Sequence, residues 1–198
     1  MIPELHNSLK RNNKITTFIG KAYLKITGWK IVGIIPKIPK MIVIIVPHTS
    51  NWDFVLTAFV SIAVDAKANF LGKHTLFKFP IIKHLMYWLG GIPVERSTRH
   101  GFVDLLTEKF KKRESLMLAL SPEGTRKKVE RWKTGFYYIA LKAGIPILPM
   151  ALDYGKKIIK FHQIFKPTGN IEKDFAYLLS LFKDVTPKNP GQFNSSQA

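Results

Sequence analysis

The sequence predicts an α/β domain in which helices flank a mostly parallel central sheet, with an N-terminal amphipathic helical element before it. Strand and helix patterns alternate along most of the chain, as they do in domains built on a parallel sheet. Met41 to Val46 is an uninterrupted apolar run rich in β-branched residues, which is typical of a strand buried on both faces. With 198 residues, 46% of them hydrophobic, the chain can bury a sizeable core in one domain.

The N-terminal part shows a helical pattern. Apolar residues recur at helical spacing from Lys14 to Ile26, with lysines among them. Gly28 ends this pattern and prolines follow it, so we expect residues 1–39 to form an amphipathic helix and a linker. Such a helix can lie in a membrane interface or simply pack on the core, and both interpretations remain open.

The main domain is expected to span residues 40–186, and the tail at 187–198, rich in Pro, Asn, Ser and Gln, is expected to be frayed. The predicted strands are 41–46, 68–71, 92–95, 116–120, 145–152 and 158–161, and the predicted helices are 54–64, 75–89 (interrupted at Pro80), 102–113, 134–143 and 171–182.

The charge balance points to an anionic partner. The chain has 31 Lys and Arg against 13 Asp and Glu, a net charge of +18 that is spread along its whole length. Nucleic acid, an anionic membrane face or a phosphorylated substrate would each fit. The sequence shows no zinc finger, no basic region with heptads and no aromatic RNA-recognition strand, which makes nucleic acid the unlikely choice. The absence of cysteine excludes disulfides, thiolate zinc sites and a cysteine nucleophile.

The sequence carries no recognisable targeting segment. The N-terminus lacks the apolar core and cleavage site of a secretory signal. Met41 to Val64 is long enough to span a bilayer, but its centre contains His48 and Asp53. We therefore expect a peripheral or monotopic protein on the cytoplasmic face of the membrane, with no transmembrane span.

His48 and Asp53 form the first candidate site. Five positions put two side chains about 140° apart on a helix, so they can meet only if His48 lies in the turn after the strand and Asp53 in the next helix. The carboxyl ends of parallel strands are where α/β domains place their sites. A histidine held by a carboxylate is an oriented general base. Alternatively, Ser50 to Asp53 is a helix capping box, in which Asp53 only satisfies backbone donors.

Two further blocks each contain a predicted strand. Gly90 to Arg96 is a short strand that ends in a guanidinium group suited to phosphate or carboxylate, although an arginine there is usually a solvated surface residue. Ile145 to Met150 is a proline-bracketed apolar strand, more probable as a wall than as a catalyst.

A fourth block, Ser121 to Arg126, follows the strand 116–120. Its proline and glycine force a tight turn, and Gly124 lets the backbone approach a ligand closely. Glu123 and Arg126 present opposite charges from this one loop.

Together, these blocks resemble the glycerolipid (lysophosphatidate-type) acyltransferase family over residues 40–155. Its four motifs are matched in order by His48 with Asp53, Gly91 to Arg96, Pro122 to Arg126 and Ile147 to Met150, and its lysine positions by Lys73 and Lys133.

The resemblance implies transfer of a fatty acyl group from an acyl thioester, carried by acyl carrier protein or coenzyme A, to the hydroxyl of a lysophospholipid such as lysophosphatidate. His48 would be the general base and Asp53 would orient it. The acceptor would be held by Arg96, Glu123, Gly124, Thr125, Arg126 and Lys73. No metal and no cofactor are implied, because the thioester is a co-substrate.

Membrane contact follows from a lipid substrate, and the helix from Lys14 and the stretch 76–89 are the candidates for contact with an anionic membrane surface. The pattern of the stretch 76–89 fits a core helix equally well, and both interpretations remain open. Two other functions remain open: a basic nucleic-acid- or membrane-binding module without catalysis, and a lipid hydrolase that uses the same His/Asp pair. The oligomeric state is left open.

Overall fold

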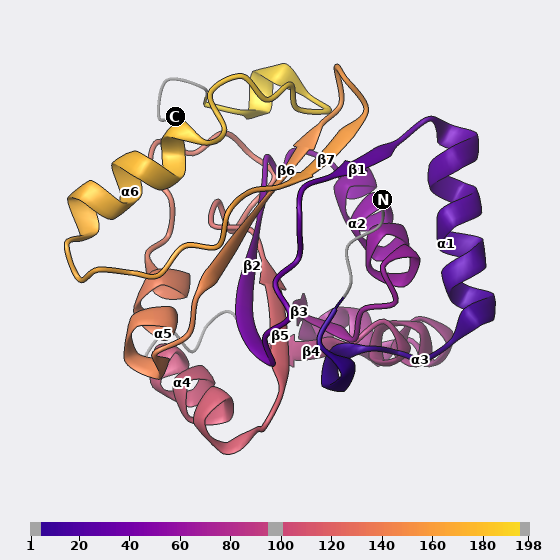
Figure 1. Ribbon diagram of the computed structural model, residues 1–198, viewed down its shortest axis with the longest axis horizontal. Coiled ribbons are helices and arrows are strands. Elements are labelled where there is room, and N and C mark those ends of the chain that lie inside the picture. Colours follow the sequence, from indigo (N-terminus) through magenta and orange to yellow (C-terminus); the bar gives the residue numbers. More distant parts are fainter. Residues whose placement is uncertain (1–4, 95–100, 195–198) are drawn as a thin grey trace.

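The computed structural model describes residues 5–94 and 101–194, in which a seven-stranded sheet runs between two layers of helices (Figure 1). The strand order is β1-β7-β6-β2-β5-β3-β4, and only the β6–β7 pair is antiparallel. The strands are β1 (Lys30–Val32), β2 (Lys40–Val46), β3 (Ala68–Lys73), β4 (Gly91–Val94), β5 (Leu116–Leu120), β6 (Ile147–Asp153) and β7 (Ile158–Phe161). The expected mostly parallel α/β fold is confirmed.

The helices cover both faces of this sheet, with α1 and α2 on one side and α4, α5 and α6 on the other (Figure 1). The helices are α1 (Lys14–Thr27), α2 (Asn51–Ala63), α3 (Pro80–Trp88), α4 (Phe102–Lys112), α5 (Gly135–Ala143) and α6 (Ile171–Ser180), with 3-10 turns η1 (Asn7–Leu9), η2 (His74–Lys78) and η3 (Pro190–Gln192).

Strand β2 shows why the apolar run at its centre is continuous. Met41 and Val43 pack into the core on the α1–α2 side, while Ile42 and Ile44 pack into the core on the α4–α6 side. Because successive side chains of a strand point to opposite faces, a strand covered on both faces needs apolar residues at every position.

Helix α1 packs closely on α2 through Gly20. A Cβ atom at Gly20 would lie 2.6 Å from the Ala63 backbone nitrogen, so the two helices approach more closely than any side chain at this position allows. The rings of Tyr23 and Phe59 stack beside this contact, with centroids 3.7 Å apart. Gly28 ends the helix with a φ of 79°, a left-handed conformation that glycine adopts readily.

Most expected boundaries differ from the structure by a few residues at most, and three segments show a difference that bears on the fold or the site. Lys30–Val32, expected within the linker, is strand β1 and pairs with β7; three half-exposed residues give too short a pattern to recognise. Helix α2 begins at Asn51 rather than 54, because Ser50 caps it. In the tail that was expected to be frayed, Pro190–Gln192 forms η3 and Asn189 is hydrogen-bonded to Thr49. Residues 195–198 lie outside the described part.

Candidate active site

His48 and Asp53 converge as their spacing requires. Strand β2 ends at Val46, so His48 lies in the turn that follows the strand and Asp53 lies in the first turn of α2. The His48 Nδ1 atom is 3.6 Å from Asp53 Oδ2. Asp53 is 1% exposed, whereas the His48 side chain is 23% exposed and can meet a ligand.

The Asp53 carboxylate makes several contacts at once. Its Oδ2 atom accepts hydrogen bonds from the backbone N–H of Thr49 (2.6 Å) and of Ser50 (2.7 Å), which completes a capping box. Its Oδ1 atom accepts a 2.6 Å hydrogen bond from the Tyr154 hydroxyl. The capping function and the contact with His48 are therefore not alternatives, because one carboxylate serves both.

These contacts keep Asp53 ionised. Burial by itself would raise the pKa of Asp53, but His48, Tyr154 and the two backbone N–H groups outweigh it and hold the pKa below its ordinary value. The pKa of Tyr154 is raised, first by burial and then by its bond to the Asp53 carboxylate, so its hydroxyl remains a donor. An ionised carboxylate close to an imidazole can stabilise the protonated ring.

Glu123 holds the backbone of His48 through a hydrogen bond. It is 5% exposed, and its Oε2 atom accepts a 2.8 Å hydrogen bond from the His48 backbone N–H. Its Oε1 atom is buried without a partner among the described residues. Burial, reinforced by the charge of Asp53 and partly offset by the His48 N–H, raises the pKa of Glu123 to about 7. The loop that follows β5 is thereby joined to the turn that follows β2.

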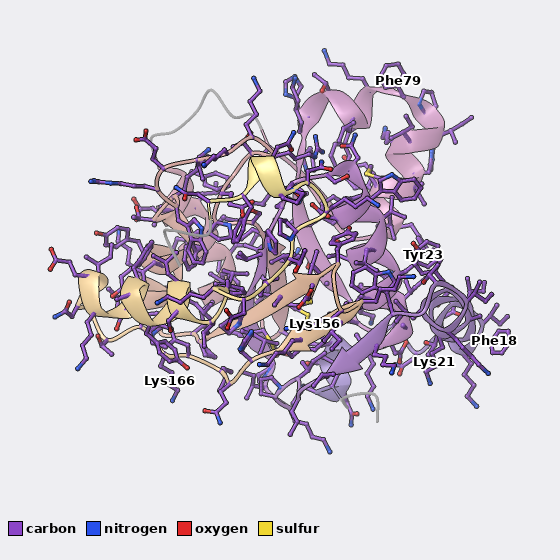
Figure 2. All side chains as sticks on the ribbon, turned by 90° about the horizontal axis from the view of Figure 1, so that it is seen from above. Phe18, Lys21, Tyr23, Phe79, Lys156 and Lys166 are labelled. Carbon is purple, nitrogen blue, oxygen red and sulfur yellow. The ribbon has the colours of Figure 1, made fainter. Side chains whose placement is uncertain are left out.

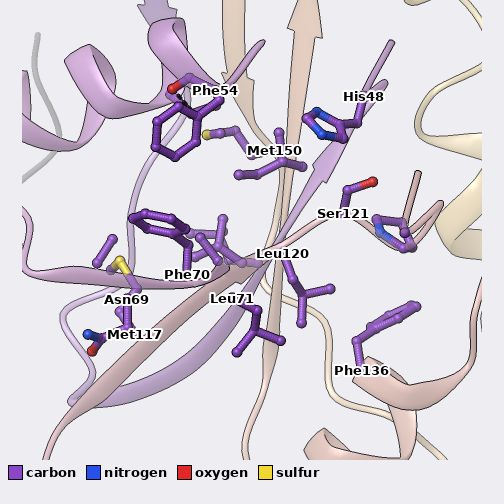
Figure 3. Close-up of a pocket in the computed structure, with 18 of the residues that line it drawn as sticks. His48, Phe54, Asn69, Phe70, Leu71, Met117, Leu120, Ser121, Phe136 and Met150 are labelled. Atoms are coloured by element: carbon purple, nitrogen blue, oxygen red, sulfur yellow. Dashed lines mark hydrogen bonds between the residues drawn. The ribbon is translucent and has the colours of Figure 1, made fainter. Parts of the chain in front are cut away.

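A cavity of about 1050 Å³ opens beside His48 (Figure 3). In Figure 3, Phe54 and Phe70 lie on one side of this cavity, with His48 and Ser121 on the other. Its apolar walls include Phe54, Phe70, Leu71, Met117, Leu120, Leu148 and Met150. The expectation that the strand 145–150 forms a wall is confirmed at Leu148 and Met150.

The cavity gathers some of the predicted site residues but not all of them. His48, Asp53, Gly124, Thr125 and Arg126 line it. Glu123, buried behind His48, and Lys73, the exposed last residue of β3, do not. Arg96 lies outside the described residues.

Gly124 has a backbone conformation that favours glycine, and the Lys133 side chain lies against it. Its φ of 65° is left-handed, and a Cβ atom there would lie 2.8 Å from Lys133 Nζ. The Lys133 backbone N–H donates to Pro122 O at 2.8 Å, which holds this lysine beside the turn. Lys133 also lines the cavity, so two cations, Arg126 and Lys133, border it.

Sequence reasoning missed Tyr154 and Thr49. Tyr154 directly follows β6, which pairs with β2 in parallel, so its place at the carboxyl edge was a usable signal. Thr49 contributes only its backbone and hydroxyl to the site, and residue type alone does not reveal such a contribution.

The described residues offer neither a metal-binding cluster nor a membrane-spanning helix. Within residues 5–94 and 101–194, no group of three or more His, Asp or Glu side chains is placed to hold a metal ion. In the same ranges, no helix combines the length and the apolar character needed to cross a bilayer.

The fold and the site define a class of protein: an α/β domain with a His–carboxylate pair and an arginine-bearing turn at the carboxyl edge of a parallel sheet. A family model described as Acyltransferase matches residues 32–153, more than half of the chain. The chain belongs to that family.

Similar proteins support the same placement. The chain is 30% identical over 124 residues to a 1-acyl-sn-glycerol-3-phosphate acyltransferase of Escherichia coli, covering 59% of this chain and 49% of that protein. It is 29% identical over 146 residues to the Haemophilus influenzae protein of the same name, covering 69% and 58% of the two chains. The matches thus span about half the length of these curated relatives.

A solved structure agrees with the fold. The crystal structure of the 1-acyl-sn-glycerophosphate (LPA) acyltransferase PlsC from Thermotoga maritima aligns with a TM-score of 0.61 at 25% sequence identity. The alignment covers 85% of this chain and 75% of that one.

Proposed function

We propose that this protein transfers a fatty acyl group from an acyl thioester to the hydroxyl of a lysophospholipid, with lysophosphatidate as the first candidate acceptor. One observation carries the proposal: an oriented imidazole faces a cavity that is walled by apolar side chains and bordered by cations. The names of the E. coli relative and of the T. maritima structure support the same acceptor class.

In the proposed reaction His48 acts as the general base. Because Nδ1 faces Asp53, Nε2 is available to take the proton of the acceptor hydroxyl. The hydroxyl oxygen then attacks the thioester carbonyl carbon and a C–O bond forms. The C–S bond breaks, and the thiol leaves with the proton that His48 received. Asp53 stabilises the imidazolium between these steps.

Direct transfer between two bound substrates is the simplest form of this reaction. The chain contains no cysteine and no Gly-x-Ser-x-Gly sequence, so no acyl-enzyme nucleophile is evident. General-base assistance contributes about 10²–10⁴-fold, and positioning of the two substrates must supply much of the rest.

The two kinds of cavity wall suit the two parts of the substrates. The aromatic pair Phe54 and Phe70, in edge contact with centroids 5.0 Å apart, offers apolar surface to a fatty acyl chain. Arg126 and Lys133 offer positive charge to the acceptor's phosphate. By family resemblance, Arg96 would add a guanidinium group and Lys73 a positive potential.

The buried position of Glu123 supports a role in positioning His48 rather than contact with the acceptor. Gly124 and Thr125 line the cavity and would approach the acceptor closely.

The donor would be acyl carrier protein or acyl-coenzyme A, and no further cofactor is needed. Both carriers bear phosphate groups. Arg126, Lys127, Lys128 and Arg131 are exposed in the segment that begins at the cavity, and would attract either carrier.

We further propose that α1 and α3 contact an anionic membrane surface on the cytoplasmic side. In α1, Ile15 and Phe18 are 74% and 71% exposed, and in the α3 region Phe79 and Ile81 are 61% and 86% exposed. Figure 2 shows Phe18 and Lys21 pointing outward from α1, whereas Tyr23 points toward the body of the protein. Each lysine near anionic headgroups is worth about 1 kcal/mol.

Vesicle flotation tests the membrane contact. We expect the chain to float with anionic vesicles, and the double variant Ile15→Ser, Phe18→Ser to float less. Leu105→Ser is the matched control, because Leu105 is 64% exposed on α4, in the opposite helix layer. Equal loss in both variants, or no binding by the unmodified chain, would exclude this membrane contact.

An assay panel tests the reaction itself. Purified protein is incubated with labelled acyl-coenzyme A or acyl carrier protein and with lysophosphatidate, lysophosphatidylethanolamine or lysophosphatidylcholine. Labelled diacyl product that depends on the acceptor supports the proposal. Free fatty acid formed equally without acceptor would instead indicate the hydrolase, and salt-resistant retention on DNA without turnover would indicate the nucleic-acid module.

A further inference from the structure

The segment 186–192 does not line the cavity, but it contacts the turn that carries His48. The backbone N–H of Asn189 donates to Thr49 Oγ1 at 3.1 Å, and the Asn189 side-chain amide donates to Thr49 O at 2.8 Å. Thr49 is 2% exposed, so its carbonyl oxygen depends on protein donors.

Gln192 joins this turn to the loop that carries Arg126. With its amide nitrogen facing the two carbonyl groups, Gln192 donates to Thr49 O and to Arg126 O, each at 2.6 Å. One side chain therefore links the loop after β2 to the loop after β5. These are the two loops that supply His48 and Arg126 to the cavity.

The same segment supports both sides of the Asp53 carboxylate. Thr49, held by Asn189 and Gln192, donates its N–H to Oδ2, and Tyr154 donates its hydroxyl to Oδ1. Tyr154 is itself held by the segment, because its backbone N–H donates to Thr186 O at 2.8 Å and Lys188 Nζ lies over its ring. The orientation of Asp53, and through it that of His48, thus depends on contacts from residues 186–192.

We propose that Asn189 and Gln192 are positioning residues for acyl transfer. Asn189 fixes the orientation of the His48–Asp53 pair through Thr49. Gln192 fixes the position of the Arg126 loop relative to that pair. The inference rests on the proposed function. It goes beyond the family match, which ends at residue 153.

The chemistry of the two side chains favours this role over simple packing. Each presents an amide donor to a backbone carbonyl, and a hydrocarbon side chain of similar size would fill the same space without that bond. Small displacements matter at a general base, since a misplacement of about 1 Å can lower a rate about 10²-fold.

Two near-isosteric variants, Asn189→Leu and Gln192→Met, test the proposal by steady-state kinetics with lysophosphatidate and acyl-coenzyme A. We expect Asn189→Leu to lower kcat about 10- to 100-fold with little change in either KM, because the base is misaligned. We expect Gln192→Met to raise the acceptor KM more than the donor KM, because Arg126 is displaced. The exposed Gln163, changed to Met, is the control and should leave all constants unchanged.

Other outcomes decide against the proposal. Unchanged kcat and KM values in both folded variants would overturn it. A decrease in kcat that only matches the fraction of unfolded protein in a thermal melt would overturn it as well. If Asn189→Leu does not fold, Asn189→Ser takes its place, with a donor too short to reach Thr49 O.

The His48 ring signals in NMR give a readout independent of turnover, and they should move in Asn189→Leu but not in Gln163→Met. If the unmodified protein acylates no lysolipid, the proposed function is wrong, whereas an active protein with unaffected variants refutes only this inference.

Discussion

Tyr154 and Asp53 lie 101 positions apart in the chain, yet the Tyr154 hydroxyl donates a 2.6 Å hydrogen bond to Asp53 Oδ1. The contact arises because β6 and β2 are parallel neighbours, so the residues that follow both strands meet at one edge of the sheet. It leaves Oδ2 for the backbone of Thr49 and Ser50 and for His48. Every side of this buried carboxylate is thereby used.

Tyr154→Phe is expected to lower both stability and activity. Hydrogen bonds to charged groups contribute about 1.5–3 kcal/mol, and the ring itself is retained. Because the pKa of Asp53 is lowered in the folded protein, the stabilisation by its ionised form is full above its ordinary pKa of 3.8 and is lost as the pH falls below it. The difference in free energy of unfolding between the two proteins should therefore be large at pH 7 and shrink below pH 3.8. Denaturant unfolding at several pH values measures it, with the exposed Tyr138→Phe as control; a pH-independent difference would contradict the prediction.

His48→Ala is expected to lower kcat about 10²–10⁴-fold, the usual contribution of a general base. The fold should persist, because the His48 side chain is partly exposed at a strand end. Turnover assays and thermal melts check both parts, with the exposed His84→Ala as control. Near-normal turnover in folded His48→Ala would exclude the mechanism.

Arg126→Met is expected to raise the acceptor KM about 10- to 100-fold, the effect of losing one hydrogen bond to a charged phosphate. The donor KM should change less. Arg96→Ala should act in the same direction if the family resemblance holds at that position. Steady-state kinetics with both substrates varied measure this, and Arg113→Met, exposed at the end of α4, is the control. An equal rise in both constants would refute the assignment to phosphate.

Glu123→Gln is expected to change how stability depends on pH. The pKa of Glu123 is raised from 4.5 to about 7 in the folded protein, so the folded state holds a proton that the unfolded state has already lost between these values. Taken alone, Glu123 therefore lowers stability by about 3 kcal/mol as the pH rises from 4.5 to 7, and this loss is complete above 7. His162, whose pKa is lowered from 6.5 to about 4 by burial and by Lys160, acts in the opposite direction between those two values. Glutamine keeps an acceptor for the His48 N–H and carries no charge, so it should remove the contribution of Glu123, and the variant should gain stability relative to the unmodified protein as the pH rises through this range. Thermal melts at several pH values in this range measure how stability depends on pH in the unmodified protein, in Glu123→Gln and in the exposed control Glu130→Gln. The same pH dependence in Glu123→Gln as in the unmodified protein would contradict the prediction.

Gly20→Ala is expected to destabilise the protein by about 1–3 kcal/mol, because the added methyl group meets the Ala63 backbone. Gly135→Ala in α5 is the control, since a Cβ there meets no atom within 4 Å. Alanine favours helix more than glycine, so the control should be neutral or stabilising. Equal melting temperatures for the two variants would contradict close packing of α1 on α2.

Much of the fold could be predicted from the sequence because its signals are local. The β-branched run at 41–46 and the helical spacing from Lys14 each identify an element without knowledge of the rest. Strand β1 has no such signal, since Lys30–Val32 becomes a strand only through pairing with β7. The convergence of His48 and Asp53 could also be predicted, because the five positions that separate them lead from the turn after a strand to the first turn of the next helix.

The rest of the site depends on contacts distant in sequence. Nothing near Glu123 indicates that its carboxylate binds the backbone of His48, 75 positions away. The composition of the tail suggested fraying, yet the same polar residues are suited to donate hydrogen bonds to buried carbonyl groups such as Thr49 O. Polar composition alone does not distinguish a solvated segment from one whose side chains donate hydrogen bonds to buried carbonyl groups.

The contact between Asn189 and Thr49 also has a consequence for the order of events during synthesis. Asn189 follows every described strand in the chain, so a ribosome has already translated the sheet and the cavity-lining residues before it reaches this asparagine. A polypeptide that ends before Asn189 would contain every described strand and all the residues that line the cavity, but neither amide donor to Thr49 O. If Asn189 and Gln192 are positioning residues, such a product would lack both of the contacts that align the His48–Asp53 pair and the Arg126 loop, and it should turn over more slowly than the complete chain.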